Sequence, residues 1–196
     1  MNSNILDINN LDSKCTCGYD IDLTLSSLLP QCRTCWLFDE KTKKTLNKSK
    51  PDDIKPEIDE IIPGVFISNQ QASKDLELLI SKEITDILIC GGVTSGLTQS
   101  YPDKFKYKQI DIEDFPHIDI TDKFEECIKF IQERDKNILV HCSFGMSRSV
   151  SFVIAYLIKI KAMSFNSAYK LIKSKRGVAY PNKGFVKQLR KLEEKI

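Results

Sequence analysis

The sequence lacks any apolar run long enough to cross a lipid bilayer. Its longest apolar run lies around Val150 to Ile160, which is shorter than the roughly 20 residues that a membrane-spanning helix needs. The first residues, Met1–Asp7, also lack the basic and apolar stretches of a secretory signal peptide. We therefore expect a soluble cytoplasmic protein without a membrane partner.

A strong excess of charge of one sign is missing as well. The formal net charge is +2, whereas nucleic-acid-binding domains usually concentrate basic residues on one face. We find no such face and no internal repeat, so we expect no nucleic-acid partner. A domain of about 140 residues can bury close to 70% of the surface that its unfolded chain exposes, and it then needs neither a metal nor a disulfide to fold.

What the sequence does contain is a stretch, His141–Ser149, that combines cysteine, glycine, arginine and hydroxyl side chains. Before it, Asn137–Val140 has the apolar, β-branched character of a buried strand, and after it Ser149–Ile160 is apolar at helical spacing. The stretch is therefore predicted to form a strand-to-helix loop. Backbone N–H groups and the helix dipole favour a tetrahedral dianion at such a place. Gly145 is expected to let the chain curl around this oxyanion without a Cβ in the way.

The same environment predicts roles for Cys142 and Arg148. A cysteine at a helix N-terminus beside a cationic group has a pKa of about 3.5–7.5 in place of about 8.5, so Cys142 is expected to be a thiolate. Arg148 offers a planar fork for two equatorial phosphate oxygens. A Cys followed six residues later by Arg is expected about 0.2 times by chance, and the adjoining His and Gly lower this to about 0.0001. The alternative, a small buried cysteine without chemistry, therefore fits poorly.

The stretch resembles the His-Cys-x-x-Gly-x-x-Arg-Ser/Thr signature of the cysteine-based protein tyrosine phosphatases, and its surroundings resemble their compact dual-specificity branch. The likeness covers about residues 57–196 and includes Ile62–Asn69, Ile84–Leu88, Tyr107–Asp114, Ala155–Leu157 and Pro181–Asn182. It implies hydrolysis of phosphotyrosine and phosphoserine or phosphothreonine in proteins through a phosphocysteine intermediate, with no cofactor for catalysis. The partners that it implies are phosphoprotein substrates, with protein kinases as candidates.

Phosphoryl transfer to sulfur leaves an alkoxide or phenolate, so a general acid is needed opposite Cys142. The segment Asp111–Asp119 offers four carboxylates at the end of a predicted strand. Asp114 falls just past that end, and it also matches the general acid of the family that the chain resembles. Asp111 and Asp119 are expected to be solvated or capping groups.

The resemblance also implies roles for residues around the nucleophile. Ser149 is expected to hydrogen-bond the departing thiolate, which is compatible with a helix N-cap position. His141 is expected to orient the loop and tune the thiol, not to act as a base. Asn182 matches an asparagine that braces the phosphate loop, although a plain helix-start residue is an equal alternative. The residues expected to bind the phosphate are Ser143, Phe144, Gly145, Met146, Ser147 and Arg148.

Strands and helices alternate along the catalytic region. We predict strands near residues 65–68, 84–90, 107–112 and 137–142, and helices near residues 70–82, 121–134, 148–161, 164–175 and 182–194. This order predicts a three-layer α/β fold, in which a largely parallel sheet is flanked by helices. The phosphate-binding loop is expected at a strand-to-helix turn outside the carboxyl end of a strand.

Residues 1–50 lie outside the resemblance and hold two close cysteine pairs. Cys15 with Cys17 and Cys32 with Cys35 would suit a structural zinc site of four thiolates. The first pair, however, has one intervening residue where such sites usually have two or more. The alternative is a metal-free segment with incidental cysteines, and disulfides are not expected in a reducing cytosol.

A basic stretch, Lys41–Lys50, separates these cysteines from the catalytic region. We interpret it as a solvated linker, with nuclear import or kinase docking as a minority interpretation. Pro51 and Pro56 mark the predicted boundary between an N-terminal segment, residues 1–50, and a catalytic domain, residues 57–196.

The side chains of the loop favour a protein substrate. Ser143, Phe144 and Met146 are uncharged. The pattern of the relatives that act on inositol phospholipids has lysine at these positions. The tyrosine-only branch of the family that the chain resembles builds a deep pocket with an aromatic Asn-Arg-Tyr loop ahead of the first strand, and this sequence has no such loop. The resemblance therefore implies a shallow site that is open to phosphoserine, phosphothreonine and phosphotyrosine. The alternatives are a phosphopeptide-binding pseudophosphatase and an RNA or lipid phosphatase on the same fold.

Overall fold

The computed structural model describes residues 55–92 and 95–196, and residues 55–196 form one compact unit. The cysteines predicted as zinc ligands, Cys15, Cys17, Cys32 and Cys35, lie outside the described residues. No helix within the described part of the chain is long and apolar enough to cross a membrane.

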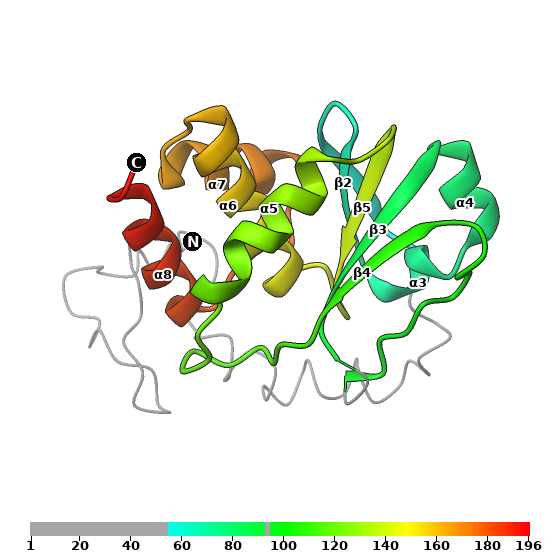
Figure 1. The fold of residues 1–196 in the computed structure, drawn as a ribbon, viewed down its shortest axis with the longest axis horizontal. Helices are drawn as coiled ribbons and strands as arrows, with labels where there is room; N and C mark the ends of the chain where they lie inside the picture. The colour runs from blue at the N-terminus through cyan, green and yellow to red at the C-terminus, as the bar shows by residue number, and fades with distance from the viewer. Residues whose placement is uncertain (1–54, 93–94) are drawn as a thin grey trace, which may run out of the picture. The chain divides into compact units, whose positions relative to one another are not determined.

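A five-stranded sheet in the order β1-β2-β5-β3-β4 runs through this unit (Figure 1). Its strands are β1 (Ile58–Ile62), β2 (Val65–Ser68), β3 (Ile84–Cys90), β4 (Lys106–Ile110) and β5 (Asn137–His141). The last four pair in parallel, and β1 pairs antiparallel with β2 at the edge of the sheet. The predicted largely parallel sheet is therefore confirmed.

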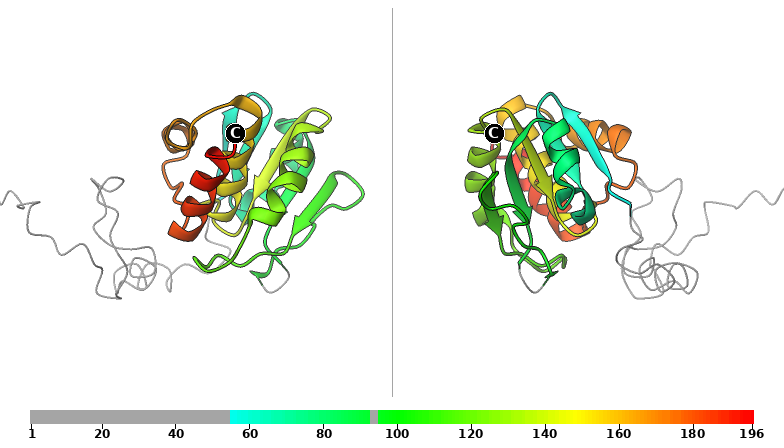
Figure 2. Two further views of the ribbon diagram at one scale, coloured as in Figure 1. Left: turned by 60° about the vertical axis from the view of Figure 1, so that its left-hand side comes forward. Right: turned by 90° about the vertical axis from the view of Figure 1, so that its right-hand side faces the viewer.

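Helices cover both faces of the sheet, so the unit has three layers (Figures 1 and 2). Two short helices, α3 (Gln70–Ser73) and α4 (Leu76–Ser81), pack on one face. The other face carries the 3₁₀ turn η4 (Thr121–Lys123) and the helices α5 (Phe124–Gln132), α6 (Arg148–Lys161), α7 (Phe165–Lys175) and α8 (Lys183–Glu193). The larger apolar core lies between this helical layer and the sheet, and its centre is α6, whose first eleven residues are all buried.

Helix ends follow local capping signals. The Ser164 hydroxyl accepts the Ser167 N–H at the start of α7, and the Asn182 side chain accepts the Phe185 N–H at the start of α8. The predictions for α6, α7 and α8 are confirmed to within a residue of each end. The single helix predicted over residues 70–82 is wrong, because the Asp75 side chain caps a new helix by accepting the Leu78 N–H.

Two strand predictions also need correction. The strand predicted over residues 107–112 ends at Ile110, although Ile112 is buried as expected. The strand predicted over residues 137–142 ends at His141. Both strands end earlier because the chain leaves the sheet there to enter the loops that carry Asp114 and Cys142.

Candidate active site

The loop 142–147 joins β5 to α6 at the carboxyl end of the central strand, as predicted. Its carbonyl groups are turned outward by donors from other parts of the chain. The Ser143 carbonyl accepts the Gln70 N–H at 3.1 Å, and the Met146 carbonyl accepts the Tyr180 N–H at 2.7 Å. Because the N–H and C=O of one peptide unit point in opposite directions, these contacts turn the loop N–H groups inward, toward an anion site.

Arg176, just after α7, holds the two middle carbonyls of the loop. Its Nη2 donates to the Phe144 carbonyl at 3.0 Å, and its Nε donates to the Gly145 carbonyl at 2.7 Å. The guanidinium is 2% exposed, and it also pairs with Asp59 and Glu57 beside it. The phosphate loop is therefore fastened to the edge of the sheet through one buried arginine.

Gly145 lies where the phosphate loop has no room for a side chain. Its φ of +65° lies in the left-handed region, and a Cβ there would overlap the Ser68 carbonyl and the Arg176 guanidinium. The missing side chain therefore makes room for the outer contacts of the loop.

Cys142 lies buried at the entrance to α6, with its Sγ 3.3 Å from the Ser149 Oγ. Burial by itself raises the pKa of this thiol. The positive charge of Arg148 and the hydrogen bonds of Ser149 outweigh burial, so the pKa of Cys142 is lowered from its usual value. Ser149 sits in the first turn of α6 and not at the N-cap, which is Ser147. Its hydroxyl therefore faces the thiol without serving as a cap.

The Arg148 guanidinium is almost fully buried and lies beside the thiol site. Its Nη2 donates to the Ser143 Oγ at 2.9 Å, and its Nη1 donates to the Ser95 Oγ at 3.1 Å. Among the described residues its Nε has no hydrogen-bond partner, so this donor suits a phosphate oxygen. Gly91 leaves the guanidinium its space, because a Cβ at this φ of +144° would overlap Nη1.

Asp114 lies against the same loop from the other side. Its Oδ1 accepts the Ser147 hydroxyl at 2.6 Å and the Asn182 side-chain amide at 2.9 Å. Its Oδ2 lies 3.9 Å from the Arg148 Nε. The structure thus brings Cys142, Arg148 and Asp114 together from three separate elements.

His141 is 1% exposed, and its pKa is lowered to about 4 by burial, which the backbone of Cys142 only partly opposes. The ring is therefore neutral near pH 7, in keeping with a positioning role beside the nucleophile. The other two candidate carboxylates, Asp111 and Asp119, are exposed, and Asp119 accepts two hydrogen bonds from Thr121 at the start of η4.

The remaining loop side chains differ in their exposure. Phe144 is 41% exposed, whereas Met146 and Ser143 are half-buried. Within residues 55–92 and 95–196 no group of three or more His, Cys, Asp or Glu side chains is placed to hold a metal ion.

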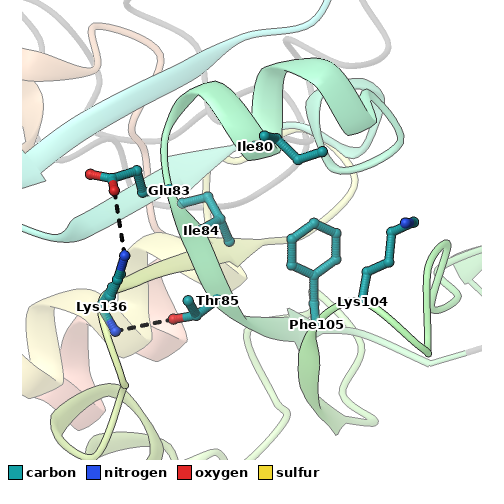
Figure 3. A pocket seen from close by; sticks show the side chains of 7 residues that line it. All are labelled: Ile80, Glu83, Ile84, Thr85, Lys104, Phe105 and Lys136. Atoms are coloured by element: carbon teal, nitrogen blue, oxygen red, sulfur yellow. Dashed lines mark hydrogen bonds and ion pairs between the residues drawn. The ribbon is translucent and has the colours of Figure 1, made fainter.

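A separate pocket of about 380 Å³ lies where β3 and β5 begin, at the end of the sheet opposite Cys142 (Figure 3). Its walls include Ile80 and Phe105, and Lys136 pairs with Glu83 at its rim. Among the described residues that line this pocket there is no cysteine or histidine.

Sequence reasoning missed three residues of the site. Arg176 follows a lysine-rich helix end and resembles a solvated basic group, while Ser95 and Gly91 lie in a segment without a motif. Only the neighbouring glycines after β3 could have indicated a close approach there. Their roles depend on contacts between distant parts of the chain.

A thiol of lowered pKa inside an anion-binding loop, with an arginine fork beside it, defines a cysteine-dependent phosphatase. Comparison with known proteins narrows this class. A family model described as "Dual specificity phosphatase, catalytic domain" matches residues 65–195. Dual specificity protein phosphatase 1B of Arabidopsis thaliana is 41% identical over 143 residues, which are 71% of this chain and 84% of that protein.

Two further relatives bear on function. MAP kinase phosphatase with leucine-rich repeats protein 3 of Dictyostelium discoideum is 40% identical over 70% of this chain and 16% of its own length. The crystal structure of human tyrosine phosphatase-like serine/threonine/tyrosine-interacting protein matches with a TM-score of 0.67 and 31% identity, over 71% of this chain and 97% of that one. The chain belongs to the dual specificity phosphatase family. It is therefore a protein phosphatase that acts on phosphoproteins and needs no cofactor for catalysis.

Proposed function

We propose that the Cys142 thiolate attacks the phosphorus of a phosphorylated side chain while the loop N–H groups and Arg148 bind the phosphate oxygens. A sulfur–phosphorus bond forms as the bond to the leaving oxygen breaks. Asp114 gives its proton to that oxygen, so the product leaves as a neutral alcohol or phenol. The preorganised positive charge of Arg148 stabilises the oxygens that carry negative charge during transfer.

The second half of the reaction returns the enzyme to its first state. Asp114, now a carboxylate, takes a proton from water as the water oxygen attacks the phosphorus. The sulfur–phosphorus bond breaks, and the Ser149 hydroxyl donates a hydrogen bond to the departing thiolate. The 3.3 Å separation of the two side chains supports this role. Inorganic phosphate is released.

The observation that carries this proposal is the buried Cys142 thiol at the entrance to α6, with the Ser149 hydroxyl 3.3 Å away and the Arg148 guanidinium on the same loop, and the lowered pKa of the thiol agrees with it. Alkylation by iodoacetamide tests it, because only the thiolate reacts. Burial raises the pKa values of Cys90 and Cys127, so at pH 6.5 Cys142 should be modified first and activity should be lost in parallel. Cys142→Ser should leave less than about 1% of the turnover, whereas Cys127→Ser should retain catalysis. Residual turnover above that level in Cys142→Ser would overturn the mechanism, whereas absence of turnover in the unmodified protein would favour a phosphopeptide-binding role.

Protein kinases are the substrates that we propose to test first. The support is the 40% identity to a Dictyostelium discoideum protein named as a MAP kinase phosphatase. Doubly phosphorylated kinase activation-loop peptides should be dephosphorylated faster than inositol phosphates or a 5′-triphosphorylated RNA. A reversed order would favour the lipid or RNA alternative.

We further propose that residues 57–196 catalyse on their own and that residues 1–50 determine location, in the cytoplasm and the nucleus. Removal of residues 1–50 should leave turnover of a small aryl phosphate unchanged. It should redistribute a fluorescent fusion if Lys41–Lys50 supports nuclear import. A collapse of small-substrate turnover would show that the N-terminal segment belongs to the catalytic core.

The four N-terminal cysteines are proposed to bind one structural zinc ion. Metal analysis of the freshly purified, reduced protein should then find about one zinc per chain, and a Cys32→Ser, Cys35→Ser double variant should lose it. Absence of zinc from the reduced protein would leave the metal-free alternative.

A further inference from the structure

The segment 114–120, which carries the proposed general acid, contains no helix or strand. It is nevertheless fastened to α8 at several points. The Gln188 side chain accepts the Ile120 N–H at 2.8 Å, and its amide donates to the Ile118 carbonyl at 2.8 Å. At the second residue of α8, Gly184 abuts Pro116 so closely that a Cβ would overlap the proline carbonyl. One face of α8 thus backs the whole segment.

The carboxyl group itself is held by a closed set of three hydrogen bonds. The Asn182 backbone N–H donates to the Ser147 Oγ at 3.1 Å, and the Ser147 hydroxyl donates to the Asp114 Oδ1 at 2.6 Å. The Asn182 side-chain amide donates to the same Oδ1 at 2.9 Å. Ser147 and Asn182 are 1% and 5% exposed, so water competes little for these bonds.

The Ser147 hydroxyl is diverted from its ordinary use. A serine at a helix N-cap usually accepts an N–H from the first turn. Ser147 occupies the N-cap of α6 but makes no such bond. Its hydroxyl instead bridges Asn182 and Asp114. α6 therefore lacks a stabilising side-chain cap, and the Ser147 hydroxyl instead fixes the position of the Asp114 carboxyl group.

We propose that Ser147 and Asn182 are positioning residues that hold Asp114 in its proton-donating place before substrate binds, with Gly184 and Gln188 of α8 as the rigid backing. This inference rests on the proposed role of Asp114 as the general acid. Both donors engage Oδ1, which assigns the transferable proton to Oδ2, the oxygen 3.9 Å from the Arg148 Nε.

Leaving-group dependence tests the inference, because a good leaving group departs without a proton and is insensitive to a misplaced acid. Ser147→Ala should lower kcat for an alkyl phosphate by about tenfold or more, a part of the 10²–10⁴-fold that a general acid supplies. It should change kcat for an aryl phosphate with an acidic phenol by less than about threefold. Vanadate inhibition should be unchanged, because the loop N–H groups and Arg148 remain.

Asn182→Asp is a second variant that keeps the fold. Its carboxylate can still accept the Phe185 N–H and cap α8, but it cannot donate to Asp114 and it adds a like charge beside it. It should show the same leaving-group dependence. Ser164→Ala removes an ordinary N-cap at α7 and is the matched control, for which both substrates should respond equally. Gly184→Ala should act like Ser147→Ala because its Cβ displaces Pro116.

The Asp114→Asn background separates the two ways of being wrong. If Asp114→Asn itself lacks leaving-group dependence, the proposed acid is misassigned. If it shows the dependence but Ser147→Ala and Asn182→Asp do not, the positioning inference fails while the acid assignment stands. If both hold, Ser147→Ala should have no further effect on the alkyl substrate once Asp114 is already Asn, because it acts through that carboxyl group.

Discussion

Arg176 Nε donates to the Gly145 carbonyl at 2.7 Å across 31 residues of sequence. This contact places a guanidinium from the end of α7 directly behind the phosphate loop, on the side away from Cys142. With the Phe144 carbonyl held by Nη2, the arginine fixes two neighbouring peptide units. It thereby determines the direction of the N–H groups that bind phosphate.

Arg176→Lys should therefore impair phosphate binding although it keeps the charge. A lysine carries its hydrogen-bond donors on a single nitrogen. It therefore cannot contact the Phe144 carbonyl, the Gly145 carbonyl and Asp59 at the same time. We expect at least a tenfold weaker vanadate inhibition and a loss of the order of 3 kcal/mol in unfolding free energy, because a buried ionic network is broken. Chemical denaturation and inhibition assays measure the two effects. Arg190→Lys, at an exposed arginine of α8, is the control, and an equal loss in both variants would contradict this role.

The sequence predicted the parts of this fold whose signals are local. The helices α6, α7 and α8 have strong apolar periodicity, and Ser164 and Asn182 show where two of them begin. β1 was missed because Asp59 and Glu60 interrupt its apolar pattern, and only Ile61 of its residues is fully buried. That strand exists because β2 offers it a free edge, which no local pattern reveals.

The site was predictable to the same extent. The spacing of Cys142 and Arg148 is a local motif, and Asp114 follows a recognisable strand. The contacts of Ser147 and Arg176 join residues that lie at least 31 positions apart in the sequence. They could therefore not be predicted from the spacing of a local motif. Residues that bind the phosphate were thus easier to predict than residues that hold the binding loop in place.

The close approach of Gly91 to the Arg148 guanidinium predicts that a side chain at position 91 impairs catalysis. In Gly91→Ala the new Cβ would overlap the guanidinium, and the φ of +144° disfavours alanine. We expect a fall in kcat of about 100-fold, as when a charge-stabilising donor is lost, together with weaker vanadate inhibition. Gly96→Ala is the matched control, since its φ is also positive but a Cβ there meets nothing. Normal turnover in Gly91→Ala would show that Arg148 adapts freely.

Phe144 and Phe115 predict an effect on substrate preference. Both rings are exposed, at 41% and 52%, and each lies within two residues of Cys142 or Asp114. An aromatic leaving group can pack on such rings, and a pair of this kind contributes about 0.5–1.5 kcal/mol. Phe144→Ala should lower kcat/KM for a phosphotyrosyl peptide about three- to tenfold and leave that for a phosphoseryl peptide nearly unchanged. Ile80→Ala, which removes an exposed apolar side chain at the opposite end of the sheet, should affect neither peptide.

His141 predicts how stability depends on pH. The folded state keeps this ring neutral down to a pKa of about 4, whereas the ring ordinarily titrates near 6.5. Between these values the unfolded chain binds a proton that the folded protein does not, so unfolding becomes easier as the pH falls from 6.5 toward 4. The loss is complete near pH 4 and amounts to at most about 3 kcal/mol. Denaturant titrations across this range should show a slope that His141→Gln removes. His117→Gln, at an exposed histidine in the segment 114–120, is the control and should leave the slope unchanged. A slope that persists in His141→Gln would mean that other groups control stability in acid.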